Sequence, residues 1–233
     1  MFFLSLAAVT ALMIFNTGCT AKAKKIYHEN RADKFYAAGQ LDRAEIEYLN
    51  ALHNAPGDAH AIGRLGLIYF QQGRMELAAP YLRKGSELAT NDLDLRLKLG
   101  FIYVAMGKLD DARAAADFVI DQRPQDPEAP LLLAQAVGTQ KELAAVQARL
   151  QKLAAAGDRP AFEVALGSLA FREHDLKSAN ASFKRALALD PKFSPALAGL
   201  ATLSIAENDL TNAEINFQAA ADDAPDRSPT KIL

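Results

Sequence analysis

The stretch LGFIYVAMGKLDDARAAADFVIDQRP, residues 99–124, contains the pattern that decides the fold. A small residue, Gly100, lies midway through one apolar segment, Ala112 lies early in the next, and Pro124 closes the unit. This pattern returns about every 34 residues, six times along the chain. Self-similarity at this period predicts a stack of helical hairpins, because one hairpin cannot bury its apolar face alone and stacking makes the core continuous.

The composition is that of a globular chain with no strong charge bias. Of the 233 residues, 50% are hydrophobic and 23% are charged, and the formal net charge is −2. Lys and Arg are spread along the sequence, so no electrostatic argument favours nucleic acid as a partner. Leu and Ala are frequent, Trp is absent and no long stretch alternates apolar with polar residues, which favours helices over strands.

The repeated unit resembles the tetratricopeptide repeat, a pair of antiparallel helices. In the first copy, Ala32 and Ala44 are small where the two helices are expected to cross, Phe35 and Tyr48 fill the space beside the crossing, and Gly39 occupies the turn. The resemblance implies an all-α, right-handed superhelical solenoid of about six hairpins. The predicted repeats are residues 25–58, 59–92, 93–126, 127–159, 160–193 and 194–226.

Two features depart from a regular array. The fourth copy is one residue short, and Lys141 stands where a turn glycine is expected. Residues 227–233 read as the start of a further repeat, and no solvating helix follows the sixth copy. An uncapped apolar end needs a partner, a second copy or further chain, so the sequence predicts either a homo-oligomer or the N-terminal part of a longer array.

The first 19 residues read as an export signal. The apolar run over residues 2–15 is shorter than the roughly 20 residues that span a bilayer, and its length suits a secretory signal. Asn16-Thr17-Gly18-Cys19 resembles a bacterial lipoprotein signal, in which the Cys is lipidated and becomes the mature N-terminus. Asn16 replaces the usual aliphatic residue, and no Lys or Arg precedes the run. The alternatives are a chance apolar leader with an inert thiol and an uncleaved anchor.

This second resemblance implies a lipid-anchored protein on the periplasmic face of a bacterial envelope. Residues 20–24 would be a short tether, with Lys22, Lys24 and Lys25 close to anionic headgroups. Thr20 is not the Asp associated with retention in the inner membrane, so the outer membrane is the preferred location.

A ligand is expected on the concave face, which the first helices of such repeats line. The inward, non-packing positions are unusually apolar in the second and third copies, and exposed apolar patches usually mark a partner site. Burial of these side chains between neighbouring helices is the alternative. The candidate partner-binding residues are Tyr36, Arg64, Leu67, Phe70, Leu97, Lys98, Phe101, Val104, Phe171 and Arg172.

No residue pattern indicates catalysis, a cofactor or a metal site. The histidines His28, His53, His60 and His174 are not at metal-ligand spacing. The sequence therefore predicts a non-catalytic scaffold that binds other proteins or peptides and recruits them to an envelope assembly of the secretion, exopolysaccharide-export or pilus type. A self-associating structural spacer and the regulatory part of a longer repeat protein remain the alternatives.

Overall fold

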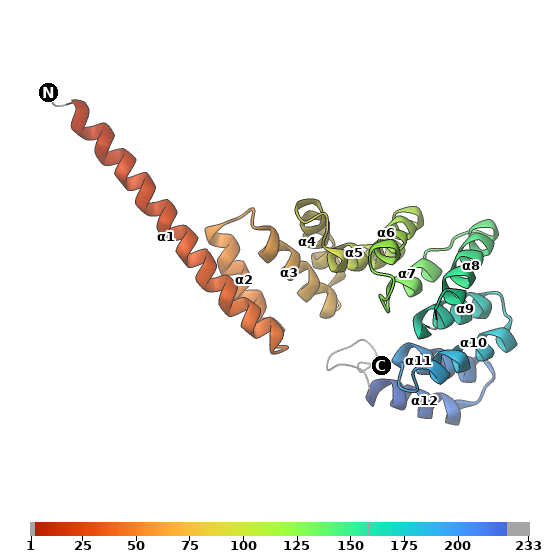
Figure 1. The fold of residues 1–233 in the computed structure, drawn as a ribbon. Coiled ribbons are helices and arrows are strands. Elements are labelled where there is room, and N and C mark those ends of the chain that lie inside the picture. The colour runs from red at the N-terminus through yellow and green to blue at the C-terminus, as the bar shows by residue number, and fades with distance from the viewer. Residues whose placement is uncertain (1–2, 158, 223–233) are drawn as a thin grey trace. The chain divides into compact units, whose positions relative to one another are not determined.

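The computed structural model describes the backbone of residues 3–157 and 159–222, and within these ranges the side chains from Thr20 onward. This part of the chain contains twelve α-helices and no strand, which confirms the all-α prediction (Figure 1). The helices are α1 (Phe3–Ala37), α2 (Leu41–Asn54), α3 (Ala59–Gln71), α4 (Met75–Leu88), α5 (Leu93–Ala105), α6 (Leu109–Gln122), α7 (Ala129–Gln135), α8 (Gln140–Ala155), α9 (Pro160–Arg172), α10 (Leu176–Leu189), α11 (Ser194–Ala206) and α12 (Leu210–Asp222).

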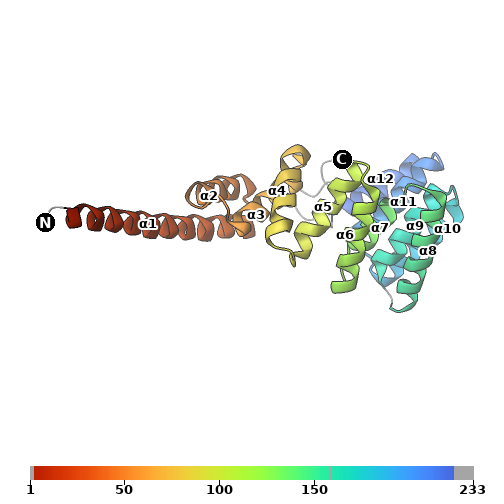
Figure 2. The same ribbon diagram turned by 90° about the horizontal axis from the view of Figure 1, so that it is seen from above.

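The helices form two compact units, Met1–Leu95 and Arg96–Leu233, and each is described by itself. In the first unit α1 packs on α2, α2 on α3 and α3 on α4. The alanines Ala32 and Ala44 and the ring of Tyr48 are fully buried between α1 and α2. Small side chains let the two backbones approach, and Tyr48 fills the remaining space, as the sequence predicts. The N-terminal part of helix α1 extends well beyond the region that packs on α2 (Figures 1 and 2).

The predicted tether is part of this long helix. Helix α1 continues without a break through residues 20–24 into the segment that packs on α2. Lys25 is held within the first unit, because its Nζ lies 2.7 Å from Glu29 Oε2 and 2.7 Å from Asp58 Oδ2. Lys22 and Lys24 are exposed.

Five of the turns between paired helices share one backbone conformation. The residue in the turn has a positive φ at Gly39 (68°), Gly73 (72°) and Gly107 (70°). His174 and Asn208 take the same position and conformation in later turns, each with φ 61°. This left-handed conformation is strained for residues other than glycine.

The second unit contains one irregular helix pair. Helix α7 has only 7 residues, whereas α8 has 16. In the described backbone, no left-handed residue joins these two helices. Instead, Thr139 and Glu142 form a capping box, in which the Thr139 hydroxyl accepts from the Glu142 N–H and the Glu142 carboxylate accepts from the Thr139 N–H. Lys141, predicted in the turn, lies in the first turn of α8.

Candidate functional site

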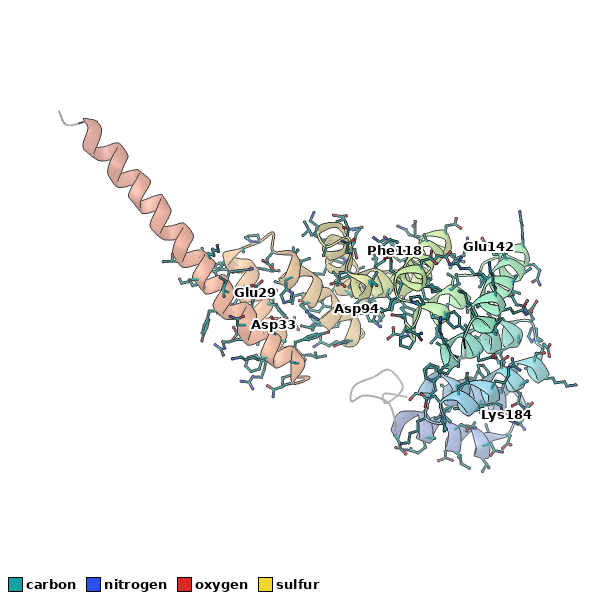
Figure 3. The ribbon with its side chains drawn as sticks, in the orientation of Figure 1. Glu29, Asp33, Asp94, Phe118, Glu142 and Lys184 are labelled. Atoms are coloured by element: carbon teal, nitrogen blue, oxygen red, sulfur yellow. The ribbon has the colours of Figure 1, made fainter. Side chains whose placement is uncertain are left out.

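The first helices of the first unit carry a polar cluster on their exposed side, which we call the first-helix surface: Asp33 and Tyr36 on α1, and His60 and Arg64 on α3. The guanidinium carbon of Arg64 lies 4.9 Å from the centre of the Tyr36 ring, a cation–π contact. Asp33 projects from α1 (Figure 3), and its Oδ1 lies 2.8 Å from His60 Nε2. The cluster therefore joins α1 to α3 through polar side chains rather than through apolar packing.

Asp33 is the centre of this cluster. The Tyr48 hydroxyl donates to Asp33 Oδ1 at 2.5 Å, on the same oxygen that faces His60. Partial burial opposes ionisation of Asp33, but the hydrogen bonds from Tyr48 and His60 outweigh it and hold the pKa of this carboxyl below its ordinary value. Burial, and then the hydrogen bond to Asp33, raise the pKa of the Tyr48 hydroxyl, which is neutral throughout the physiological range.

A cavity of about 270 Å³ lies beside this cluster in the first unit. His60 and Arg64 line one part of it, and Asp92 lines another. Asp92 accepts hydrogen bonds from the N–H groups of Asp94 and Leu95, so its carboxylate is already engaged at the start of α5. Arg64 is therefore the side chain that faces this cavity with hydrogen-bond donors to offer, because His60 already donates to Asp33.

Two of the predicted binding residues are buried. Leu67 is 7% exposed and Leu97 is 3% exposed, so the expectation that these leucines form an exposed apolar patch is wrong. Leu67 lies on the same cavity wall as Gly63 and Leu95, where the absence of a side chain on Gly63 lets Leu95 approach α3 closely. Phe70, Phe101 and Val104 are half-buried and keep part of their apolar surface exposed.

In the second unit, Lys98 forms an ion pair with Glu128 and lies 5.8 Å from the centre of the Phe101 ring. Phe171 packs against the buried cluster that contains Val164 and Phe183. Lys98, Phe101 and Phe171 are thus already in contact with other parts of this unit.

Arg172 is exposed, and its guanidinium also hydrogen-bonds to the chain itself. Its Nη1 donates to the carbonyl of Ala134 at 3.2 Å and its Nη2 donates to the carbonyl of Val137 at 2.8 Å. Arg113 Nη1 donates to the carbonyl of Ala136 at 2.6 Å. Two arginines therefore satisfy the carbonyls at the end of the short helix α7, where a regular turn is missing.

Cys19, the predicted lipid-attachment residue, lies outside the residues whose side chains the structure describes, and residues 227–233 lie outside the described residues altogether. Among the described residues, no helix combines the length and the apolar character needed to cross a membrane. In the same part of the chain, no group of three or more His, Cys, Asp or Glu residues could hold a metal ion.

Sequence reasoning missed the pairing of Asp33 with His60 and the two arginines at the end of α7. Asp33 and His60 are 27 positions apart, and only the packing of α1 against its neighbours brings them together. The missing turn glycine of the fourth repeat was the one visible signal that some other group had to satisfy the carbonyls there.

Known proteins with the same repeat support this architecture. The tetratricopeptide repeat matches residues 69–136 and 170–230, and a second form of the same repeat matches residues 30–91. Among curated proteins, DnaJ homolog subfamily C member 3 of Bos taurus is 29% identical over 110 residues, which are 47% of this chain and 22% of that protein. The chain thus aligns with only about a fifth of the length of this relative.

Solved structures with similar folds cover most of the chain. A thermophilic tetratricopeptide repeat protein of Thermus thermophilus is 18% identical with a TM-score of 0.58, over 75% of this chain and 96% of its own. PilW, a type IV pilus biogenesis factor, is 15% identical with a TM-score of 0.60, and the match covers 90% of this chain and 98% of PilW. Pseudomonas aeruginosa pilF is 14% identical with a TM-score of 0.53, and the match covers 85% of this chain and 91% of pilF. Identities this low show a shared fold alone. The repeat matches, which cover more than half of the chain, show that it belongs to the tetratricopeptide repeat family.

Proposed function

We propose that this protein is a non-catalytic scaffold that binds other proteins or peptides through its first helices and recruits them to an assembly at the bacterial envelope. Tetratricopeptide repeats typically serve as protein-interaction scaffolds. The observation that carries the proposal is the first-helix surface, where Arg64 and His60 face a cavity of about 270 Å³. The Arg64 guanidinium beside such a cavity suits a partner segment that brings hydrogen-bond acceptors, such as carbonyl or carboxylate oxygens.

Photo-crosslinking in native membranes tests where the partner binds. A photoreactive residue in place of Gln71, which is exposed and donates to the Tyr36 hydroxyl at 3.2 Å, samples the first-helix surface. The same residue in place of Lys84, exposed on α4, is the matched control. We expect envelope proteins to crosslink at position 71 and not at position 84, and Arg64→Ala to reduce the yield. Equal crosslinking at both positions, or a yield that Arg64→Ala leaves unchanged, would move the binding site elsewhere.

The proposed anchor is a lipid on Cys19. The supporting observations are the Cys19 sequence context and the exposed Lys22 and Lys24 next to it, which suit anionic headgroups. Labelled palmitate should enter the wild-type protein and not Cys19→Ala. Label that persists in Cys19→Ala would exclude this anchor, and fractionation of the envelope would then decide between an inert leader and an uncleaved apolar anchor.

The envelope assembly that the scaffold serves has still to be identified. A pilus-assembly system is one candidate, because PilW and pilF share the fold. Secretion and exopolysaccharide export are the other two. Mass measurement over a range of concentrations discriminates the scaffold from a self-associating spacer. A monomer that captures envelope proteins supports the scaffold, whereas a stable oligomer that captures none supports the spacer.

A further inference from the structure

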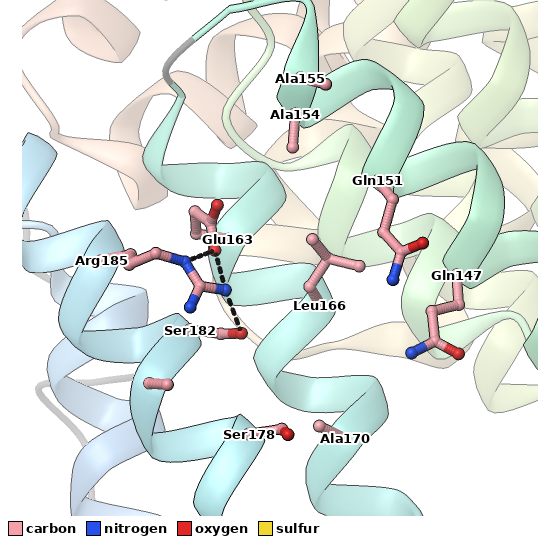
Figure 4. A pocket seen from close by; sticks show the side chains of 11 residues that line it. Gln147, Gln151, Ala154, Ala155, Glu163, Leu166, Ala170, Ser178, Ser182 and Arg185 are labelled. Carbon is pink, nitrogen blue, oxygen red and sulfur yellow. Dashed lines mark hydrogen bonds and ion pairs between the residues drawn. The ribbon is translucent and has the colours of Figure 1, made fainter.

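A second cavity lies entirely within the second unit, away from the first-helix surface, and has a volume of about 460 Å³. It is a groove bounded by α8, α9 and α10, and we call it the α8–α10 groove (Figure 4). Its size falls within the range of pockets that hold small molecules or short peptide segments. Helices α8 and α10 are the second helices of their pairs, so this groove is distinct from the surface on which the proposed function depends.

Two glutamines of α8 present side-chain amides to the groove. Gln147 and Gln151 project from α8 toward Leu166 of α9 (Figure 4). Neither amide has a hydrogen-bond partner among the described residues, whereas Gln140 on the same helix donates to Glu173 Oε1 at 3.1 Å. An amide side chain both donates and accepts, so the two glutamines offer a pair of donor–acceptor sites to a ligand.

The opposite wall is polar but electrically balanced. Arg185 Nη2 lies 2.8 Å from Glu163 Oε2, and Arg185 Nε donates to the same oxygen at 2.9 Å. Arg185 also donates to the hydroxyl of Ser182 at 2.9 Å, and Ser182 is only 5% exposed. The ion pair cancels the charges on this wall, so the groove favours a neutral ligand over a strongly charged one.

The rest of the lining is small and apolar. Leu166 and four alanines line the groove between the two polar walls. Because these side chains are small, the groove has room for short apolar side chains of a ligand to pack on them. The lining contains no aromatic residue, so it lacks a ring face on which a sugar could stack.

We propose that the α8–α10 groove binds an extended, uncharged peptide segment through its main chain. Residues four apart on a helix lie about 6 Å apart along the axis. In an extended chain, the N–H and C=O groups on one edge recur every second residue, or about 6.7 Å. The amides of Gln147 and Gln151 therefore match two successive main-chain groups on one edge of the peptide. Alternate side chains of the bound segment then point to the alanine and Leu166 surface.

A peptide selection on the purified full chain tests this inference. The probe is a display library of random ten-residue peptides without Lys, Arg, Asp or Glu, and the affinities of selected peptides are measured by fluorescence anisotropy. We expect the double variant Gln147→Ala/Gln151→Ala to bind them about tenfold or more weakly, since two hydrogen bonds are removed. The matched control Gln140→Ala, on the same helix but outside the groove, should bind as the wild type does. Both glutamines are at least partly exposed, so the double variant is expected to fold, and its circular dichroism and melting temperature verify this.

A backbone N-methyl scan of one selected peptide tests the mode of binding. Methylation at every second residue should weaken binding, and methylation at the residues between should not, because only one edge faces the glutamines. The inference is overturned if the library yields no binder, if binding does not depend on Gln147 and Gln151, or if the scan shows no alternation. Glutamine-dependent binding of neutral oligosaccharides, with no peptide binder, would also overturn it. Arg64→Ala should leave peptide binding at this groove unchanged, so failure here is distinguishable from failure of the first-helix proposal.

Discussion

Gly167 on α9 lies directly against the ring of Phe183 on α10, where a methyl group added to the glycine would lie 2.7 Å from Phe183 Cε1. Gly199 on α11 lies against the same ring, and a methyl group added there would lie 2.6 Å from Phe183 Cε1. Phe183 is 3% exposed and belongs to the buried cluster of this unit. One aromatic side chain thus fills the space where three helices meet, and the two glycines leave room for it.

We expect Gly167→Ala to lower the free energy of unfolding by about 1–3 kcal/mol, because the added methyl overpacks the site against Phe183. Urea unfolding measures the change. The matched control is Gly57→Ala, since a Cβ at Gly57 would have no neighbour within 4 Å. Adding Phe183→Leu to Gly167→Ala should recover part of the loss, and a double variant whose loss equals the sum of the two single losses would contradict the overpacking explanation.

The turn at His174 predicts a stabilising substitution. Its φ of 61° is unfavourable for a side chain with a Cβ, and glycine occupies this position in three other turns. His174→Gly should therefore raise the free energy of unfolding by about 1 kcal/mol, the difference between the left-handed strain and the entropic cost of glycine. Asn208→Gly should gain less, because Asn tolerates this conformation better.

Glu207→Gly is the control for the turn, because Glu207 has an ordinary φ of −87°. There the substitution only adds freedom to the unfolded chain and is expected to be neutral or destabilising. Thermal unfolding of all three variants separates the cases. A melting temperature that falls in His174→Gly would show that the histidine side chain contributes a contact that outweighs the strain.

The contacts of Arg113 are expected to stabilise the irregular pair of helices α7 and α8. It donates to the carbonyl of Ala136, a fully buried residue, and its Nη2 lies 2.7 Å from Glu142 Oε1. Arg113→Met should cost about 1–3 kcal/mol in urea unfolding, because the Ala136 carbonyl loses its donor. Arg113→Lys should recover little, since an ammonium group lacks the planar fork that reaches both partners.

Arg83→Met is the control for Arg113, because Arg83 is exposed on α4 and is expected to change stability by no more than about 0.5 kcal/mol. Equal losses in the two methionine variants would show that the contact at the end of α7 contributes nothing of its own. Hydrogen exchange of the α7 amides in Arg113→Met gives a local measure of the same effect.

The Asp33 cluster predicts a pH dependence. Because hydrogen bonds from Tyr48 and His60 hold the pKa of Asp33 below its ordinary value, its ionised form stabilises the folded protein. This contribution is complete above the ordinary pKa of about 3.9 and is lost as the pH falls through the lowered pKa of the folded state. Asp33→Asn should therefore be less stable than the wild type at pH values well above the ordinary Asp33 pKa, and the difference should shrink as the solution is made more acidic.

Urea midpoints of the two proteins, measured from neutral pH down into the acid range, test this dependence. His60→Ala separates the two donors, because it leaves only the Tyr48 hydrogen bond on Asp33 and should show a smaller version of the same change. A difference between wild type and Asp33→Asn that stays constant with pH would show that the Asp33 ionisation does not contribute to stability.

Much of the fold can be predicted from the local sequence. The 34-residue period predicts paired helices because each pair needs the same small, bulky and turn residues at the same places. Ala32, Ala44 and Gly39 are at those places and behave as predicted, since crossing and turn geometry depend on side-chain size and backbone freedom. His174 shows that the period predicts the turn even where the residue type does not.

The candidate sites are less readable, because they depend on contacts between residues far apart in the chain. The register predicts inward positions for Leu67 and Leu97 and leaves both exposure and burial open, and close packing of neighbouring helices buries both. Arg172, a predicted partner-binding residue, is exposed and also donates to two carbonyls at the end of α7, a contact that the register does not predict. No local pattern distinguishes a leucine that faces solvent from one that a neighbouring helix covers.

The helix pairs, most of their turns and the family follow from the sequence, because they depend on short-range periodicity and on the conformational limits of single residues. The tertiary structure sets which side chains remain available to a ligand. It joined Asp33 to His60, closed the end of α7 with Arg113 and Arg172, and left the amides of Gln147 and Gln151 facing a groove. Availability depends on what the neighbouring helices cover, and that is settled by packing across the repeats rather than within one.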